Sequence, residues 1–372
     1  MNGQARTILH VFSTFGVGGP QIRFTQLANH FGGRYRHYIV PMDGATDVLA
    51  RLGSGVDASL LMVPNRRGRL WLNVRAFRKT LRDLKPDVLV TSNWGTIEWA
   101  LANLDGRVRH LHMEDGFGSE EANTQIARRI WMRRLILRRS TVLLPSRTLL
   151  SIARDVWRLP ERCLIHVPNG VDCIRFRLPR DQKLMADIGI SGELPVIGTV
   201  ASLRSEKNIR RLIDAFAGVL QRRQAQLLIV GDGPERERLI VHAAETGISK
   251  HVIFTGASAK PEKILPFFTI FALSSDTEQM PLSVLEAMAA GLPLAATDVG
   301  DVRYMLAKEN APFLVKTEAD CLSESILALL ADPARAIAIG EANARRAADL
   351  FSENLMFTAY RDLFDGLRPP RA

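Results

Sequence analysis

From residue 276 to residue 293 the chain reads Asp-Thr-Glu-Gln-Met-Pro-Leu-Ser-Val-Leu-Glu-Ala-Met-Ala-Ala-Gly-Leu-Pro. Pro281 suits the first turn of a helix and Gly291 suits its end, so the run predicts a helix over about 281–290. Glu286 then lies mid-helix among residues that are almost all apolar. An unpaired carboxylate on such a covered helix is costly. We therefore expect a polyol ligand to donate hydroxyl groups to Glu286; the alternative is an ordinary solvated glutamate.

On both sides of this run, short apolar segments alternate with segments of helical period, which is typical of parallel sheets wrapped by helices. The predicted strands cover residues 8–14, 38–41, 87–92, 109–113 and 142–145 in the first half, and 195–201, 227–230, 252–254, 270–274 and 294–296 in the second. The pattern predicts an α/β protein with two tandem Rossmann-like, doubly wound domains. A length of 372 residues is sufficient for two cores.

The domain boundary is predicted from breaks in this alternation. Pro168, Pro179 and Gly189 interrupt it, so the linker is placed near residues 169–192. The first domain is then expected over residues 1–175 and the second over residues 190–350. The segment 353–367 has apolar residues on one side and predicts a terminal helix.

Composition restricts the protein class. With 47% hydrophobic and 24% charged residues, the chain is typical of ordinary water-soluble proteins. Cys163, Cys173 and Cys321 have unrelated spacings, which predicts neither a disulfide framework nor a zinc site. The apolar run 8–12 is too short for a signal peptide, and no segment reaches membrane-spanning length. We expect a cytoplasmic location from these features.

The net charge of +10 is unevenly distributed. Residues 1–185 hold 29 Lys+Arg against 15 Asp+Glu, a balance of +14, whereas the remainder has a balance of −4. This asymmetry indicates that the first half faces an anionic partner: a phospholipid surface, an acidic glycan or nucleic acid. The basic run 128–139 favours peripheral attachment to a membrane. However, helical spacing scatters its arginines around the axis, so arginine stems covering a domain edge explain it equally well.

Three polar segments follow predicted strands, where doubly wound sheets bind ligands. Gly18 and Gly19 belong to the run 16–19, a candidate phosphate or acceptor loop because its amides open a helix; the alternative is a simple turn. The run is not a complete dinucleotide fingerprint, since Arg23 and its neighbours occupy the stretch that should end in glycine. In the loop 202–208, Arg204 and Lys207 provide cations for phosphate oxygens, or are solvated surface.

The third segment is the polar run after the strand 109–113. His112, Glu114 and Asp115 are its candidate site residues, and a capped turn with satisfied polar groups is the alternative. Asn93 and Trp94 follow the preceding strand and are weaker candidates for the same region. The chain contains no Asp-x-Asp sequence, so no carboxylate pair is predicted to hold a metal ion.

Several of these runs together resemble one family. Glu278 and Glu286 reproduce the Glu-x7-Glu signature of retaining glycosyltransferases of GT-B architecture, glycosyltransferase group 1 or family 4. The loop 202–208, the Gly-Asp-Gly-Pro turn 231–234 and the Val-Pro-Asn-Gly-Val-Asp segment 167–172 are similar to segments of the same family. The last two runs are interpreted mainly as structural segments and not as residues that take part in the chemistry. The resemblance covers nearly the whole chain and is most specific over residues 204–300.

The resemblance implies roles for the candidate residues. Glu286 would hold the nucleotide ribose, Glu278 would lie beside the transferred sugar, and Arg204 with Lys207 would grip the donor diphosphate. The glycine loop would approach the donor phosphates, and a polar group after the strand 109–113 would lie near the sugar or acceptor. The amides around the residues Met280, Pro281 and Leu282 would help to stabilise the leaving group.

The resemblance also implies the architecture and the partners. The two domains would enclose a cleft, with the terminal helix crossing back to the first, acceptor-binding domain. The expected donor is a nucleotide diphosphate sugar, and the acceptor is a glycan or a lipid-linked molecule of envelope polysaccharide synthesis. Neither a cofactor, a metal ion nor nucleic acid is expected, and contact with the inner face of the membrane is a hypothesis. The rival functions are a sugar-nucleotide epimerase of the same fold and a non-enzymatic protein that binds anionic surfaces.

Overall fold

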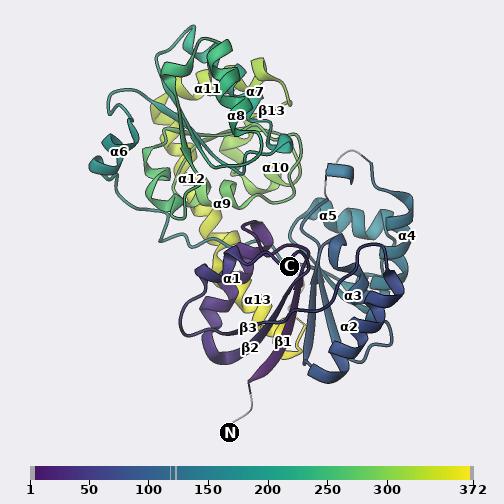
Figure 1. Ribbon diagram of the computed structural model, residues 1–372. Coiled ribbons are helices and arrows are strands. Elements are labelled where there is room, and N and C mark those ends of the chain that lie inside the picture. Colours follow the sequence, from purple (N-terminus) through teal and green to yellow (C-terminus); the bar gives the residue numbers. More distant parts are fainter. Residues whose placement is uncertain (1–4, 118, 122–123, 369–372) are drawn as a thin grey trace. The chain divides into compact units, whose positions relative to one another are not determined.

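The computed structural model describes residues 5–117, 119–121 and 124–368, in two compact units (Figure 1). The first unit comprises Met1–Asn169 and Met356–Ala372, and the second comprises Gly170–Leu355. Residues 1–4 and 369–372 of the predicted first domain and terminal helix lie outside the described part. Each unit is built around one parallel sheet with its own hydrophobic core.

The first unit contains a seven-stranded sheet in the order β3-β2-β1-β4-β5-β6-β7. Its strands are β1 (Arg6–Phe12), β2 (Tyr35–Pro41), β3 (Asp57–Leu60), β4 (Val88–Ser92), β5 (Arg109–Met113), β6 (Thr141–Leu144) and β7 (Leu164–His166). All neighbouring strands run parallel. The strand order reverses between β1 and β4, so the loops after these two strands meet at the topological switch point of the sheet.

Helices surround this sheet: α1 (Gly19–Phe31), α2 (Leu70–Leu84), α3 (Ile97–Ala102), α4 (Ala127–Ile136), α5 (Arg147–Ser151) and the terminal α13 (Glu353–Asp365). In α2, Val74, Phe77 and Leu81 recur at helical spacing and are buried in the core. Lys85 ends this helix in the left-handed region. Tyr360 and Phe364 of α13 are buried against β1, β4 and β5, so the last helix completes the core of the first unit (Figure 1).

The second unit contains a six-stranded parallel sheet in the order β10-β9-β8-β11-β12-β13. Its strands are β8 (Val196–Val200), β9 (Gln226–Val230), β10 (Val252–Gly256), β11 (Ile270–Leu273), β12 (Leu294–Thr297) and β13 (Leu314–Val315). Here the order reverses between β8 and β11. The loops that begin at residues 201 and 274 are therefore neighbours at the switch point.

The helices of the second unit are α6 (Gln182–Ile188), α7 (Ile209–Leu220), α8 (Arg236–Glu245), α9 (Leu282–Ala289), α10 (Val302–Met305), α11 (Ala319–Ala331) and α12 (Pro333–Phe351). Three have side-chain caps, in which Asp181, Asn208 and Asp332 accept hydrogen bonds from backbone amides of α6, α7 and α12. α9 contributes Val284, Leu285 and Met288 to the core, which fixes the helix that carries Glu286.

The prediction of two doubly wound units is confirmed, and every predicted strand is present. Three further strands, β3, β7 and β13, escaped prediction because they are short edge elements with two to four residues. The segment 169–192, which was predicted as a linker, is assigned mostly to the second unit. From Gly170 onward it belongs to the second unit, where Val171 and Phe176 pack into the core, and it contains α6.

Candidate functional site

The loops after β8 and β11 form the central part of the candidate site in the second unit. Lys207 lies in the first loop and Glu278 in the second, and Lys207 Nζ is 2.5 Å from Glu278 Oε1. Ser275 Oγ donates to the same carboxylate oxygen at 2.7 Å. The side chains of Lys207 and Glu278 are 18% and 8% exposed, so the ion pair is largely shielded from water. The structure thus brings together two residues that are 71 positions apart in the sequence.

Further hydrogen bonds join these two loops. The amide of Asp276 donates to the carbonyl of Glu206 at 2.9 Å, and Ser274 Oγ donates to the carbonyl of Lys207 at 3.0 Å. Arg211, in the first turn of α7, bonds both Asp276 and the carbonyl of Ser274. The position of the Lys207 ammonium is therefore set by backbone contacts as well as by its carboxylate partner.

Arg204 does not join this ion pair. Its side chain is 58% exposed and pairs with Glu206 at 3.0 Å, while Nε also donates to Ser202 Oγ at 3.2 Å. An exposed pair of this kind is worth about 0–1 kcal/mol, so the guanidinium can exchange Glu206 for a phosphate at little cost. The structure places the two predicted cations in one loop and only Lys207 against Glu278.

The Gly-Asp-Gly-Pro turn, which was interpreted as a structural segment, packs against the loop 202–208 that carries Arg204 and Lys207. The amide of Leu203 donates to the carbonyl of Asp232 at 2.9 Å, and the amide of Glu235 donates back to Leu203 at 3.0 Å. A Cβ atom on Gly231, whose φ is +152°, would lie 1.8 Å from the carbonyl oxygen of Ala201. Glycine at this position therefore lets the turn approach the loop that carries Arg204 and Lys207.

Gly300 supports the acidic loop in the same way. Its φ is +55°, and a Cβ atom there would lie 2.0 Å from the carbonyl oxygen of Glu278. The amide of Asp301 also donates to the carbonyl of Gln279 at 3.0 Å. These contacts hold the backbone of residues 278–279 in place.

We expect Gly300→Ala to displace the Glu278 loop. The substitution should lower the free energy of unfolding by about 1–3 kcal/mol, because it combines a strained φ with an overlap against backbone atoms. Chemical denaturation of both proteins measures this effect. The matched control is Gly247→Ala, which has a similar φ of +77° but no atom within 4 Å of the added Cβ, so it isolates the cost of backbone strain. Equal losses in the two variants would contradict the role assigned to the contact with Glu278.

The helix predicted at 281–290 is α9, which begins at Leu282 after Pro281 as its N-cap residue. Pro281 has no N–H group, so it cannot contribute an amide donor to the set predicted around Met280, Pro281 and Leu282. The first turn of α9 starts at the switch point directly after the Glu278 loop. Its Leu282 and Ser283 amides occupy positions at which a helix has no internal acceptor.

Glu286 lies in the middle of α9 and is half-buried, so part of the residue still contacts water. No hydrogen bond or ion pair to its carboxylate occurs among the described residues. Burial raises the pKa of Glu286 to about 8, while Arg175 opposes the rise and Glu262 adds to it. Arg175 is itself paired with Glu262 at 2.9 Å. The carboxylate is thus partly exposed and has no hydrogen-bond or ion-pair partner among the described residues, and its predicted role towards a ligand stays a prediction.

This raised pKa gives a testable pH dependence. The folded state holds the Glu286 proton more tightly than the unfolded state does. Protonation of Glu286 therefore stabilises the folded state at low pH. This stabilisation is lost as the pH rises from about 4.5 through about 8. We expect Glu286→Gln to flatten the decline in thermal stability over this range, by an amount on the order of 2 kcal/mol given the partial exposure of the residue. The exposed Glu309→Gln is the control and should follow the wild-type profile; identical profiles for all three proteins would contradict this interpretation.

In the first unit, Gly18 and Gly19 lie at the switch point between β1 and β4. Gly18 is the N-cap residue of α1, and Gly19 is its first residue. A Cβ atom on Gly19 would meet nothing within 4 Å, so packing does not explain this glycine. The loops after β1 and β4 touch, because a Cβ atom on Gly95 would lie 2.6 Å from Ser13 Cβ. The available space around Gly19 is compatible with close approach of a ligand.

His112 and Glu114 lie at the carboxyl end of β5 and are both fully buried. His112 Nδ1 is 2.8 Å from Thr91 Oγ1, and its Nε2 is 3.4 Å from Glu114 Oε2. His110 reaches the same threonine hydroxyl at 2.8 Å, and burial together with His112 lowers the pKa of His110 to about 3. The structure thus places these predicted site residues in a polar network inside the first unit. Their roles towards a ligand stay predictions.

Asp115 forms a second cluster with Arg23 and Asn169, which were not predicted site residues, and with Asn93, which was a weaker candidate. Arg23 of α1 donates to both carboxylate oxygens of Asp115, at 2.5 and 2.8 Å, and to Asn169 Oδ1 at 2.9 Å. Asn93, which has a φ of +58°, accepts from the amide of Asp115 at 2.7 Å. Arg23 occupies the stretch in which the dinucleotide fingerprint would have a glycine. This departure from the fingerprint is the feature of the sequence that could have pointed to Arg23.

The basic run 128–139 is α4 together with the turn that follows it. Its residue Arg133 is buried between the faces of Trp94, Phe117 and Trp157, at 5.1, 5.4 and 4.9 Å from the ring centroids. Arg133 also contacts the buried carboxylates of Glu114 and Glu121 at 3.2–3.3 Å. This part of the run therefore holds the segment after β5 in place, and Arg133 is enclosed in the core instead of covering a domain edge.

Among the described residues, no three His, Cys, Asp or Glu side chains come together as a candidate metal site. In the same residues, no helix combines the length and the apolar character needed to cross a membrane.

Comparison with known proteins gives the family and supports the fold. The profile described as "Glycosyl transferases group 1" matches residues 180–346, and "Glycosyltransferase Family 4" matches residues 17–175. Similar solved structures include a glycosyltransferase from Rickettsia africae ESF-5, with a TM-score of 0.82, 17% identity and coverage of 98% of this chain and 99% of that chain. Anabaena HepE in complex with UDP and glucose has a TM-score of 0.83, 18% identity and coverage of 97% and 100%.

Curated relatives align over part of their length. The GDP-mannose-dependent alpha-(1-6)-phosphatidylinositol monomannoside mannosyltransferase of Mycolicibacterium smegmatis is 30% identical over 57% of this chain and 59% of its own. The N-acetyl-alpha-D-glucosaminyl L-malate synthase of Bacillus anthracis is 25% identical over 55% and 54%. The alignments thus span little more than half of these relatives. Two family profiles, one for each unit, and the shared fold show that the chain belongs to the GT-B glycosyltransferases of group 1 and family 4.

Proposed function

We propose that this protein transfers a hexosyl or related sugar from a nucleotide diphosphate sugar to a glycan or lipid-linked acceptor, with retention of anomeric configuration. The observation that carries the proposal is the shielded Lys207–Glu278 pair at the switch point, eight residues before the half-buried carboxylate of Glu286. In this proposal, the loops at the switch point carry a cation for phosphate and an acid for sugar hydroxyls, and the helix that follows carries an acid for ribose. The names of the relatives, which include a mannosyltransferase and a glucosyldiacylglycerol synthase, support this substrate class.

In the proposed mechanism, charge develops on the departing nucleotide diphosphate. Lys207 and the first amides of α9 stabilise that charge electrostatically, and Arg204 leaves Glu206 to bind the phosphates. Glu278 accepts hydrogen bonds from the transferred sugar, and Glu286 accepts them from the ribose. No metal ion or cofactor takes part in this scheme, and no side chain acts as a covalent nucleophile.

The first unit would bind the acceptor. Gly18 and Gly19 open α1 at the switch point of its sheet, and the space beside Gly19 is free of other atoms within 4 Å of an added Cβ. The relatives named above include enzymes of lipid-linked glycans, so cell-envelope polysaccharide or glycolipid synthesis is the proposed setting. A cytoplasmic location, at the inner face of the membrane, is part of the same proposal.

A donor screen tests the proposal. UDP-, GDP- and ADP-sugars are titrated against the full chain, and each binding donor is then incubated with candidate acceptors. Release of the nucleotide with a glycosylated acceptor supports transfer, and anomeric proton couplings in the product test retention. An isomerised sugar nucleotide would instead favour the epimerase. Turnover that is unchanged after treatment with a chelator tests metal independence.

Glu286→Ala tests whether Glu286 takes part in binding the sugar nucleotide donor. The variant should bind the donor about 5- to 100-fold more weakly with an intact fold, because it leaves the ribose hydroxyl groups without their acceptor, which costs about 1–3 kcal/mol. The control Glu309→Ala removes an exposed glutamate of the same unit and should bind normally. Unchanged donor binding by Glu286→Ala would remove the assigned role. Absence of binding to any sugar nucleotide by the wild-type chain would refute the function.

A further inference from the structure

A stripe of polar side chains follows one face of β5, a strand in the interior of the first sheet. His110, His112 and Glu114 alternate with Leu111 and Met113, and side chains two positions apart along a strand point to the same face. All three polar residues are buried. Because buried polar groups need hydrogen-bond partners inside the protein, the stripe has to belong to a larger network.

The network extends the stripe onto the two neighbouring strands. Thr91 of β4 lies opposite His112 in the register of the sheet, and its Oγ1 is 2.8 Å from His112 Nδ1 and 2.8 Å from His110 Nε2. Ser140, the residue before β6, has its Oγ 2.7 Å from His110 Nδ1. These four residues are at most 8% exposed. One threonine hydroxyl therefore joins the two imidazoles, and a serine hydroxyl ends the series.

The other end of the network is ionic. His112 Nε2 is 3.4 Å from Glu114 Oε2, and Nε of Arg133, in α4, is 3.3 Å from the same oxygen. The guanidinium carbon of Arg133 also lies 5.1 Å from the ring centroid of Trp94, in the loop after β4. We call the connected residues the β5 chain: Ser140, His110, Thr91, His112, Glu114 and Arg133.

The groups at the ionic end determine the position of one proton. A guanidinium group only donates hydrogen bonds, and a carboxylate oxygen only accepts them. The proton between His112 and Glu114 therefore lies on Nε2 of His112. His110 carries only one proton at neutral pH, because burial and the neighbouring His112 lower its pKa to about 3.

The threonine hydroxyl determines the remaining protons. It has one hydrogen, so it donates to one imidazole and accepts from the other. In a neutral His112 with its proton on Nε2, the acceptor is Nδ1, so Thr91 donates to His112 and accepts from Nε2–H of His110. Nδ1 of His110 then accepts from Ser140. All hydrogen bonds from Ser140 to Glu114 thus point in one direction, and each donor has an acceptor.

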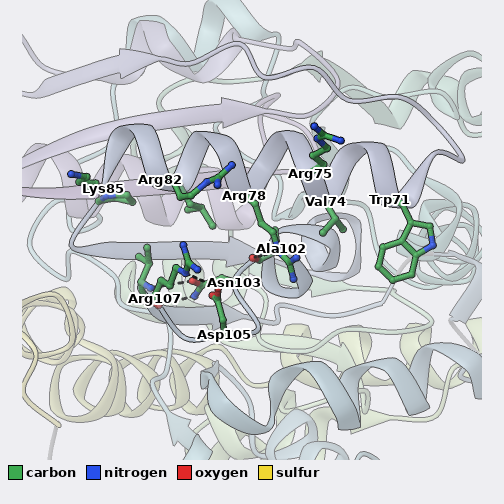
Figure 2. Close-up of a pocket in the computed structure, with 13 residues that line it drawn as sticks. Trp71, Val74, Arg75, Arg78, Arg82, Lys85, Ala102, Asn103, Asp105 and Arg107 are labelled. Carbon is green, nitrogen blue, oxygen red and sulfur yellow. Dashed lines mark hydrogen bonds and ion pairs between the residues drawn. The ribbon is translucent and has the colours of Figure 1, made fainter.

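The β5 chain connects the two edges of the first sheet. Ser140 precedes β6, so this end lies at the amino edge, where a groove of about 740 Å³ is lined by Arg107 and Val108 directly before β5 (Figure 2). Glu114 follows β5 at the carboxyl edge, where doubly wound sheets bind their ligands. Because the members of the chain are buried, they act on a ligand only through the loops that Glu114 and Arg133 contact.

We propose that the β5 chain is a positioning device, which holds His112 as its Nε2–H tautomer and thereby fixes the loops after β4 and β5 for binding of the acceptor. Its hydroxyl and imidazole groups are positioning residues that do not touch the substrate. A chain with all its protons aligned favours one arrangement of Glu114 and Arg133, and that arrangement includes the contact with Trp94. The link to the acceptor rests on the proposed glycosyl transfer, whereas the order of the protons does not.

The order of the protons is tested by NMR of the full chain with ¹⁵N-labelled histidine, since the shifts of ring nitrogens distinguish protonated from unprotonated atoms. In the wild type at neutral pH, His110 and His112 should both be neutral with the proton on Nε2. Thr91→Val removes the hydroxyl but keeps the branched shape, so the proton of His110 should move to Nδ1, where Ser140 can accept it. Thr91→Ser keeps the hydroxyl and should keep the wild-type tautomers.

Two spectroscopic results would overturn the proposal. A wild-type His112 with two protons, or a proton on Nδ1 of either imidazole, would contradict the derived order. A His110 tautomer that is the same in Thr91→Val as in the wild type would show that the hydroxyl does not determine it. The wild-type spectrum decides the first point without any variant, so it applies even if Thr91→Val does not fold.

Steady-state kinetics test the link to the acceptor. Thr91→Val should lower kcat/KM for the acceptor about tenfold, since a small misplacement of positioning groups costs up to ~10²-fold in rate. Donor binding, which is proposed for the second unit, should be unchanged. Thr91→Ser should recover the acceptor kinetics. The control Thr80→Val makes the same change on α2, where Thr80 Oγ1 donates to the carbonyl of Ala76, and should match the wild type.

The kinetic outcomes separate this inference from the proposed function. Normal acceptor kinetics in Thr91→Val, together with altered tautomers, would overturn the positioning role while leaving glycosyl transfer in place. Equal losses in Thr91→Val and Thr80→Val would show a general effect on the first unit and would also overturn it. Absence of transfer by the wild type would refute the function and the link to the acceptor, and the histidine spectra would still decide the order of the protons.

Discussion

Lys207→Ala is expected to lower turnover with the sugar nucleotide by about 10²–10³-fold, the usual cost of removing one preorganised group that stabilises transition-state charge. The ammonium group lies 2.5 Å from Glu278 Oε1 with 18% of the side chain exposed, so it acts where water screens charge only weakly. The substitution also leaves the carboxylate of Glu278 with Ser275 as its remaining donor. Steady-state kinetics with the donor found in the screen measure the effect, and a donor titration separates binding from turnover.

Controls for this prediction separate charge from position. Lys207→Arg keeps the positive charge but spreads it over a planar group, so it should recover only part of the activity. Lys250→Ala removes an exposed lysine of the same unit and should be neutral. Glu278→Gln keeps the shape of the acid while removing its charge, and should also impair turnover. A change of less than about threefold in Lys207→Ala would be inconsistent with leaving-group stabilisation by this residue.

Arg133→Met is expected to destabilise the first unit by about 3–5 kcal/mol, because it leaves the buried carboxylate of Glu114 without a cation and leaves Glu121 with Arg129 alone. The side chains of Arg133, Glu114 and Glu121 are at most 1% exposed. Methionine preserves much of the apolar volume between the three aromatic rings, so the loss reports mainly on charge. Hydrogen exchange at the β5 amides measures the free energy of opening of this unit without assuming that both units unfold together.

Two control variants test whether the loss of stability in Arg133→Met comes from the buried charges. Adding Glu114→Gln to Arg133→Met removes the unpaired charge and should recover part of the stability, while Glu121 keeps its pair with Arg129. Arg128→Met changes an exposed residue of the same helix and should alter stability by less than about 0.5 kcal/mol. A loss below about 1 kcal/mol in Arg133→Met would show that the buried network is not a stabilising unit.

The sequence by itself determined the class of fold and the family. Apolar strands alternate with amphipathic helices along the chain, which is the pattern of a parallel sheet covered by helices. Each of these segments can be recognised from neighbouring residues alone. The run 276–293 determined in the same way that Glu286 lies mid-helix on an apolar background, and the structure shows it half-buried with its pKa raised. Burial on a helix follows from neighbours within two turns, so it can be inferred without knowing the tertiary structure.

The tertiary structure decided which of the candidate residues meet. Lys207 reaches Glu278 across 71 positions because the sheet reverses its strand order between β8 and β11, and Arg204 in the same loop faces solvent instead. Side chains that are close in sequence can point to opposite sides of a loop. The local sequence pattern does not predict that direction. His112 and Glu114 were selected by position after a strand, yet both lie in a buried network whose partner Arg133 comes from a helix that the sequence presented only as basic. Such pairings arise from long-range packing, and packing is a property of the folded chain.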